Sequence, residues 1–124
     1  MKLSGDFFNV LSVDGTTNTV LLNADHAIFK AHFPGHPITP GVCLVQMVQE
    51  LLSQHLGCPL YIRSIRNVKF TSVVSPAIDS RLTVSLSGIS DEGGTVKAQA
   101  LLSGAGDVSR VFAKMSLILE KEPF

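Results

Sequence analysis

The chain has 124 residues, of which 45% are hydrophobic and 16% are charged. This composition excludes a disordered chain, and the length predicts one domain spanning residues 1–124 rather than two. Ten basic and ten acidic side chains cancel, so the charge balance favours neither a nucleic acid nor an anionic membrane surface as a partner. Residues 1–10 lack the apolar core of a signal peptide, and no apolar run approaches the roughly 20 residues of a membrane span. We therefore expect a cytoplasmic protein.

The N-terminal part of the chain predicts a β-hairpin followed by a short helical turn. Segments 7–13 and 19–22 are apolar and β-prone, and Asp14-Gly15 between them is a strong turn signal. In segment 23–31, Asn23 or Asp25 is suited to capping a short turn of helix.

One long helix is predicted over Gly41–Leu56, with Gly57 ending it. Apolar side chains cover well over half of its circumference when they are plotted at 100° per residue. Gln46, Glu50 and Ser53 form a narrow polar stripe. A helix this apolar is expected to be wrapped by other structure rather than to lie on a surface.

The remainder of the chain has β patterning. Strands are predicted over 61–70, 81–87, 95–103 and 108–119, with a break at Ser75-Pro76 and turns at Gly93-Gly94 and 104–107. The pattern is two strands, a helix and four strands. It predicts an α+β fold in which a curved antiparallel sheet of about six strands wraps around one long central helix.

The loop before the helix carries the residues that best suit catalysis. His32 and His36 lie among Pro34, Gly35, Pro37 and Pro40, which exclude a helix there. Beside Phe33, the His32 ring is expected to be partly desolvated, which keeps it neutral and able to act as a base. The alternative is a loop histidine that only hydrogen-bonds its own backbone.

Other chemistries are less well supported by the residue pattern. The spacing of His32 and His36 imitates a helical zinc pair, but the prolines exclude that helix, and we expect no metal. Cys43 lies between apolar neighbours, which favours a buried cysteine over a nucleophile. Along a continuous helix, Cys43 and Cys58 would lie about 22 Å apart, so we expect free thiols rather than a disulfide.

Residues 32–42 read HFPGHPITPGV, and this segment resembles the signature of the β-hydroxyacyl-acyl-carrier-protein dehydratases of the FabZ/FabA type. Weaker similarity covers most of the chain, including segment 23–31 and the strand that contains Asn67-Val68-Lys69-Phe70. The resemblance implies a hot-dog fold. It also implies that two protomers join their sheets edge to edge, in a homodimer or a higher oligomer of dimers, with the active sites in a tunnel between the two protomers.

The resemblance also implies a substrate and a set of site residues. The substrate would be a 3-hydroxyacyl chain on the phosphopantetheine arm of acyl carrier protein, and no cofactor would be needed. His32 would take the α-proton and the Gly41 N–H would bind the thioester carbonyl, where negative charge develops. Further contacts to the substrate would come from Phe33, His36, Pro40, Val42 and Phe70.

The chain departs from the family pattern at one position. The family places Glu or Asp fourteen residues after the histidine, and here that residue is Gln46. An amide can hydrogen-bond the departing hydroxyl but cannot protonate it, and losing a general acid typically costs about 10²- to 10⁴-fold. Glu50, Asp25 or His36 could replace the missing acid.

Three hypotheses follow from this departure. The first is a dehydratase in which Gln46 substitutes for the acid by hydrogen bonding. The second is a catalytically silent acyl-binding partner that completes a mixed oligomer with an active, carboxylate-bearing homologue. The third is a hot-dog acyl thioesterase in which His32 activates water.

Overall fold

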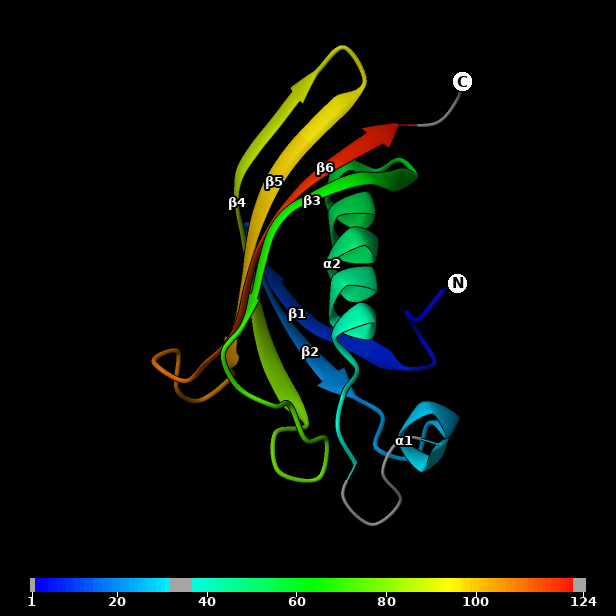
Figure 1. Cartoon of the computed structure of the whole chain (residues 1–124), viewed down its shortest axis with the longest axis vertical. Helices are drawn as coiled ribbons and strands as arrows, with labels where there is room; N and C mark the ends of the chain where they lie inside the picture. Colours follow the sequence, from blue (N-terminus) through cyan, green and yellow to red (C-terminus); the bar gives the residue numbers. More distant parts are fainter. Residues whose placement is uncertain (1, 32–36, 122–124) are drawn as a thin grey trace.

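A six-stranded antiparallel sheet curves around one long helix (Figure 1). The computed structural model describes residues 2–31 and 37–121. The elements in chain order are β1 (Phe8–Asp14), β2 (Thr17–Leu22), α1 (Ala27–Ala31), α2 (Gly41–Leu56), β3 (Leu60–Phe70), β4 (Arg81–Glu92), β5 (Thr95–Gly104) and β6 (Val111–Lys121). The strand order in the sheet is β1-β2-β4-β5-β6-β3, and every neighbouring pair is antiparallel. The α+β prediction is therefore confirmed.

Helix α2 has the predicted bounds, Gly41–Leu56. Gly57 ends it with a φ of 71°, in the left-handed region that glycine adopts readily, and its N–H donates to the Ser53 carbonyl at 2.9 Å. The helix lies on the concave side of the sheet (Figure 1). Its buried residues are Cys43, Leu44, Val45, Met47, Val48, Leu51 and Leu52, as expected for a helix wrapped by other structure.

Two strands differ from the predicted bounds by more than two residues at one end. Strand β4 continues to Glu92 instead of ending at position 87, because Gly88 (φ 57°) allows a bulge between Ser87 and Ser90. Strand β6 begins at Val111 rather than at 108, because residues 107–110 form the turn that Gly104 closes by donating to the Arg110 carbonyl at 3.0 Å. The predicted break after β3 is present, and the Ile78 and Asp79 N–H groups donate to the Ser75 carbonyl.

Both cysteines are free thiols, as predicted. Burial raises the pKa of the Cys43 thiol, which favours the protonated form and counts against a nucleophilic role.

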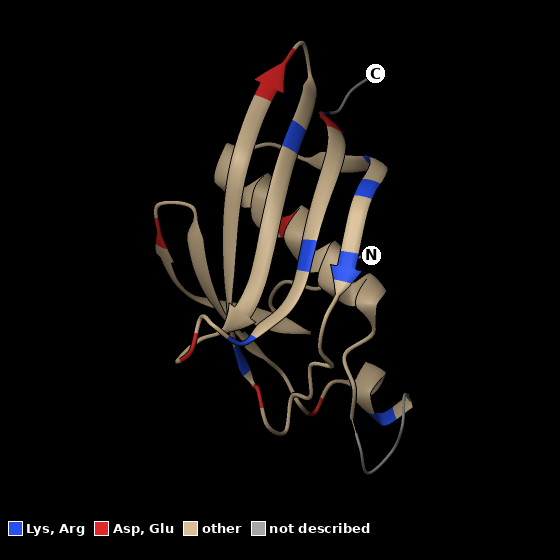
Figure 2. Ribbon diagram, turned by 60° about the vertical axis from the view of Figure 1, so that its left-hand side comes forward, with Lys and Arg blue, Asp and Glu red and all other residues tan. Residues whose placement is uncertain are grey.

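Charged residues are spread over separate strands and loops, and most of the ribbon is uncharged (Figure 2). This distribution agrees with the formal net charge of zero. Within residues 2–31 and 37–121, no helix has both the length and the apolar character needed to cross a membrane.

Candidate functional site

The residue just before the first turn of α2 has no side-chain group that can cap the helix. Pro40 is the N-cap residue, with φ −60° and ψ 139°, and its ring has no hydrogen-bonding group. The preceding Thr39 is held in place because its N–H donates to the Val74 carbonyl at 2.8 Å. The first backbone N–H groups of a helix have no partner inside the helix. This end of α2 is therefore suited to binding an oxygen that carries negative charge.

Gly41 and Phe70 meet at this end of the helix. A Cβ atom built on Gly41 would lie 2.7 Å from Cζ of the Phe70 ring and 3.0 Å from its Cε2. Phe70 is the last residue of β3, and its side chain is half-exposed. The close approach explains why a residue without a side chain begins α2. The family resemblance points to both residues, but the sequence alone gives no reason for them to touch.

The remaining motif residues are only partly described. Pro40 is half-buried and Val42 is 68% exposed, which leaves the Val42 side chain open to a ligand or to another subunit. The candidates His32, Phe33 and His36 lie outside the described residues. Their predicted roles remain predictions.

The polar stripe of α2 forms a hydrogen-bonded pair. The Gln46 Nε2 donates to Glu50 Oε2 at 2.9 Å, across one helical turn. Both residues are half-buried. They line a groove between the N-terminal segment, α2 and the start of β3, together with Lys2, Gln49 and Tyr61.

Glu50 also binds the N-terminal segment of the chain. Its Oε1 accepts from the Leu3 N–H at 3.0 Å and from the Ser4 N–H at 2.7 Å, and its Oε2 accepts from Leu3 N–H at 2.8 Å. The adjoining Leu3 side chain is buried in the core. Backbone and amide N–H groups thus occupy both carboxylate oxygens. This arrangement counts against Glu50 as the acid that replaces a residue at position 46.

The other candidate acid and the third histidine belong to the turn before α1. Asp25 is exposed, and its N–H donates to Asn23 Oδ1 at 3.0 Å. The predicted cap is supplied instead by His26, whose Nδ1 accepts from the Ile28 N–H at 3.0 Å while its Nε2 lies 3.2 Å from Asp6 Oδ2. Among residues 2–31 and 37–121, no three histidine, cysteine, aspartate or glutamate side chains gather as a metal ion requires.

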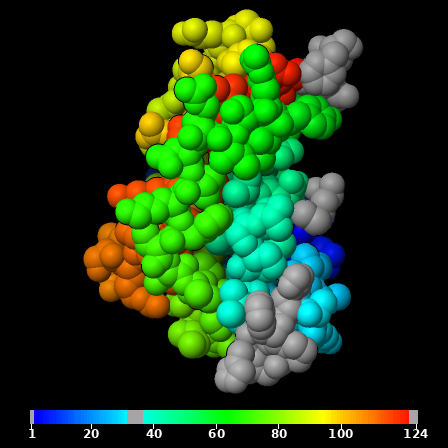
Figure 3. All heavy atoms as spheres, viewed as in Figure 1, coloured from blue at the N-terminus to red at the C-terminus, as the bar shows by residue number. Residues whose placement is uncertain are grey.

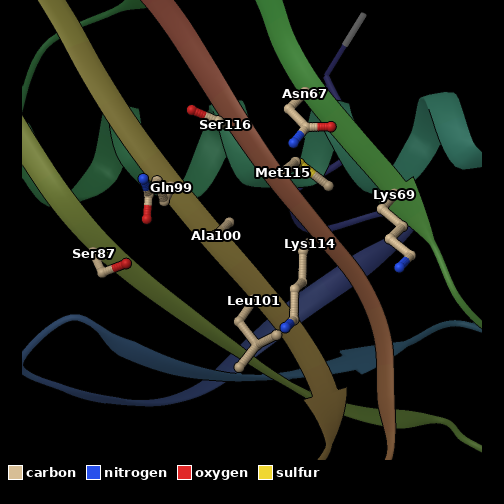
Figure 4. A pocket seen from close by; sticks show the side chains of 9 residues that line it. All are labelled: Asn67, Lys69, Ser87, Gln99, Ala100, Leu101, Lys114, Met115 and Ser116. Carbon is tan, nitrogen blue, oxygen red and sulfur yellow. The ribbon is translucent and has the colours of Figure 1, made fainter.

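A second depression lies on the sheet, on the face turned away from α2 (Figure 4). Polar side chains of adjacent strands line it, among them Asn67, Ser87, Gln99 and Ser116, with Lys69 and Lys114 on one side. None of its described lining residues is a histidine or a carboxylate. A side chain that could act as a general base through an imidazole or a carboxylate is therefore not found among them.

One family model and several known proteins are similar to this chain. The model of the ApeI-like family, described as ApeI dehydratase, matches residues 12–101. The chain belongs to the ApeI-like dehydratase family. It is also 34% identical over 84 residues to the 3-hydroxyacyl-[acyl-carrier-protein] dehydratase FabZ of Ligilactobacillus salivarius, covering 62% of this chain and 60% of that protein. The resemblance to FabZ-type dehydratases is thus confirmed, and the matched segment spans about 60% of that relative's length.

Solved structures confirm the hot-dog fold of this ApeI-like chain. The ApeI:P dehydratase heterocomplex of Xenorhabdus doucetiae is similar with a TM-score of 0.59 at 19% identity, covering 86% of this chain and 89% of that one. A hypothetical thioesterase of Streptococcus pneumoniae has a TM-score of 0.66 at 10% identity, covering 93% of this chain and 85% of that one. At these identities the likeness extends to the fold alone.

Proposed function

We propose that this ApeI-like protein binds a 3-hydroxyacyl thioester, carried on the phosphopantetheine arm of an acyl carrier protein, and eliminates water from it. His32 takes a proton from C2, the Gly41 N–H binds the thioester oxygen, and Gln46 hydrogen-bonds the 3-hydroxyl. The observation that supports this most is the side-chain-free start of α2, where Gly41 lies against Phe70. An N–H donor there stabilises the negative charge that develops on the thioester oxygen.

In this elimination the departing 3-hydroxyl needs a proton that Gln46 cannot supply. When the base takes the C2 proton, the electrons form the C2–C3 double bond and the C3–O bond breaks. The departing oxygen leaves as water only after it receives a proton. An amide cannot supply this proton, so it must come from water or from another group. We expect slow turnover compared with a carboxylate-bearing dehydratase.

His32→Ala tests the proposed base. We expect the rate of enoyl product formation from a 3-hydroxyacyl-carrier-protein thioester to fall by at least about 10²-fold, because general-base catalysis is lost. The circular dichroism spectrum should stay unchanged. His55→Ala is the matched control, because His55 is exposed in the last turn of α2.

Two results would contradict the proposed dehydratase. Equal turnover by wild type and His32→Ala would remove the assigned base. Release of free thiol without enoyl product would instead indicate the acyl thioesterase.

A second candidate function is that of an acyl-binding partner subunit. It is favoured by the hydrogen bond that ties the Gln46 amide to Glu50, because neither group then offers an acidic proton to a substrate. One solved structure with a similar fold is that of a dehydratase heterocomplex. In this case the chain alone would be inactive, and it would copurify with a carboxylate-bearing hot-dog subunit when the two are expressed together from their native genes.

Either function is compatible with an oligomer formed through β3. This strand is at the edge of the sheet, and its exposed side chains include Ile65 (51%) and Phe70 (49%). Its surface lies beside that of α2 on one face of the molecule (Figure 3). A second subunit that pairs with this edge would cover unpaired backbone groups and apolar side chains together.

Ile65→Lys tests this arrangement. In a symmetric dimer each subunit would place the new charge at the shared edge, where like charges repel. We expect light scattering to show a dimer or larger oligomer for wild type and a monomer for Ile65→Lys. Val108→Lys serves as the control because Val108 is also exposed (68%) but lies outside the strands. A monomeric wild-type protein, or an unchanged mass in Ile65→Lys, would refute pairing through β3.

A further inference from the structure

The loop between β3 and β4 contacts the segment that leads into α2. The Thr39 N–H donates to the Val74 carbonyl at 2.8 Å. Thr39 is 5% exposed and Val74 is 1% exposed, so this hydrogen bond joins two buried residues. Only Pro40 separates Thr39 from Gly41, and the proline ring fixes the rotation about its own N–Cα bond. The position of the Thr39 backbone therefore strongly limits where the first N–H of α2 can point.

The direction of the Val74 carbonyl depends on the turn that follows it. Burial of the Val74 side chain fixes the position of this residue, but its carbonyl can still rotate together with the next planar peptide unit. That unit is restrained because the Ser75 carbonyl accepts from the Asp79 N–H at 2.7 Å. Pro76 also favours extended conformations of Ser75. The turn from Ser75 to Asp79 thus determines where the Val74 carbonyl points.

Arg110 holds this turn from the loop between β5 and β6. Its Nη1 donates to Asp79 Oδ1 at 2.8 Å and its Nη2 donates to Asp79 Oδ2 at 3.2 Å, which makes the contact bidentate. The Arg110 backbone is itself fixed, because its carbonyl accepts from the Gly104 N–H and its N–H donates to the Asp107 carbonyl. The guanidinium carbon lies 5.4 Å from the centre of the Phe112 ring. The β3–β4 loop therefore has the β5–β6 loop on one side and the start of α2 on the other (Figure 1).

We propose that the ion pair between Arg110 and Asp79 positions the oxyanion donor Gly41 from a distance. The pair acts through the turn that follows Val74 and through the hydrogen bond to Thr39, so both of its members are positioning residues. The Arg110 side chain is 52% exposed, and ion pairs this exposed add little to the free energy of unfolding. The pair therefore affects where the Gly41 N–H points more than whether the chain folds. This inference rests on the proposed function, because that function makes Gly41 the donor to the thioester oxygen.

Asp79→Asn tests the inference because it keeps the shape of the side chain and removes its charge. An amide offers Arg110 one acceptor oxygen instead of two, so the bidentate contact is lost. The first readout is amide hydrogen exchange of the full chain, measured by NMR. We expect the Thr39 N–H to exchange about tenfold faster, because one charge-assisted hydrogen bond no longer opposes local opening. Amides in the middle of β5 should keep their wild-type rates.

Turnover is the second readout. We expect kcat for dehydration to fall by roughly tenfold in Asp79→Asn, because a displaced donor stabilises the charge on the thioester oxygen less well. KM should change little, since the residues proposed to bind the acyl chain are unaltered. The thermal midpoint should stay close to that of wild type, which separates a change in position from a loss of fold.

Asp91→Asn is the matched control. Asp91 Oδ2 accepts from Lys121 Nζ in another ion pair, close to the β4–β5 turn and at the opposite end of the sheet from the start of α2 (Figure 1). This variant should change neither the Thr39 exchange rate nor kcat. Arg110→Lys keeps the charge but removes the planar fork, so it should act in the same direction as Asp79→Asn. Adding it to Asp79→Asn should change kcat by less than about twofold, because both substitutions remove one contact.

The two readouts separate this inference from the proposed function. An unchanged Thr39 exchange rate in Asp79→Asn would overturn the positioning role and leave the proposed function intact, as would faster exchange with unchanged kcat. An inactive wild type would overturn the proposed function and the catalytic role of the pair, whereas the exchange rates would still show whether the pair holds Thr39. If Asp79→Asn also accelerates exchange in β5, Arg110→Lys decides the matter, because it leaves the Asp79 carboxylate facing a cation.

Discussion

Gln46→Glu should raise the rate of dehydration by about 10²- to 10⁴-fold over the wild-type chain, the usual contribution of a positioned general acid. The new carboxyl group would take the place of an amide whose NH₂ lies 2.9 Å from Glu50 Oε2. Enoyl product formation from a 3-hydroxyacyl-carrier-protein thioester measures the gain. Gln54→Glu makes the same exchange in an exposed position of the same helix and should not raise the rate.

The neighbouring Glu50 should help the new acid to keep its proton. Two carboxylates at hydrogen-bond distance repel each other when both are ionised, so the pair retains one shared proton to a higher pH. A general acid works only while it is protonated, and activity should therefore fall when the pH rises through this raised value. In Gln46→Glu combined with Glu50→Gln, the repulsion is absent. The alkaline limb of its pH–rate profile should move to lower pH.

Three other outcomes for wild type and Gln46→Glu would change this interpretation. If wild type turns over and Gln46→Glu is no faster, the leaving hydroxyl receives its proton elsewhere, and the exposed Asp25 becomes the next candidate. If wild type is inactive and Gln46→Glu is active, the site is intact apart from its acid, which favours the partner-subunit function. If both are inactive, the proposed dehydratase is wrong.

Local patterns were sufficient to predict the bounds of α2, which carries several residues of the candidate site. Prolines and Gly41 mark its start, Gly57 marks its end, and the apolar periodicity separates Gln46 and Glu50 from the core. The strand ends were harder to predict, because a glycine can end a strand or form a bulge within it. Gly88 does the second, and only pairing with β5 shows it.

The contacts that define the candidate site are the ones that sequence reasoning missed. Glu50 binds the N–H groups of Leu3 and Ser4 across 47 and 46 residues of chain. No local pattern reports such a separation, and backbone donors leave no trace in side-chain identity. The sequence predicts the polar stripe on α2, but it does not predict the backbone N–H groups that donate to Glu50. The same holds for Gly41 and Phe70, which become neighbours only when β3 folds beside α2.

Gly41→Ala should lower kcat by about 10²-fold, because an atomic displacement near 1 Å at a catalytic donor has an effect of this size. The added Cβ would lie 2.7 Å from Phe70 Cζ and 3.3 Å from Cε1, so either the ring or the start of α2 must move. Steady-state kinetics measures the loss. Gly106→Ala is the matched control, since a Cβ at Gly106 meets nothing within 4 Å.

A double-mutant cycle with Phe70→Leu identifies the cause of that loss. Phe70 is 49% exposed and at the end of β3, so a smaller side chain there is tolerated and leaves room for the new methyl group. Phe70→Leu alone should mainly raise KM, because it removes a proposed substrate contact. In the Phe70→Leu background, Gly41→Ala should cost less than about tenfold, and this non-additivity is what contact between the two residues requires.

Two other results would change the role assigned to Gly41. If Gly41→Ala costs the same with and without the Phe70 ring, the methyl group itself blocks access to the backbone N–H and the ring is irrelevant. If Gly41→Ala leaves kcat unchanged in both backgrounds while the thermal midpoint also stays the same, Gly41 is not the oxyanion donor. The negative charge on the thioester oxygen would then be stabilised by a group other than the first N–H of α2.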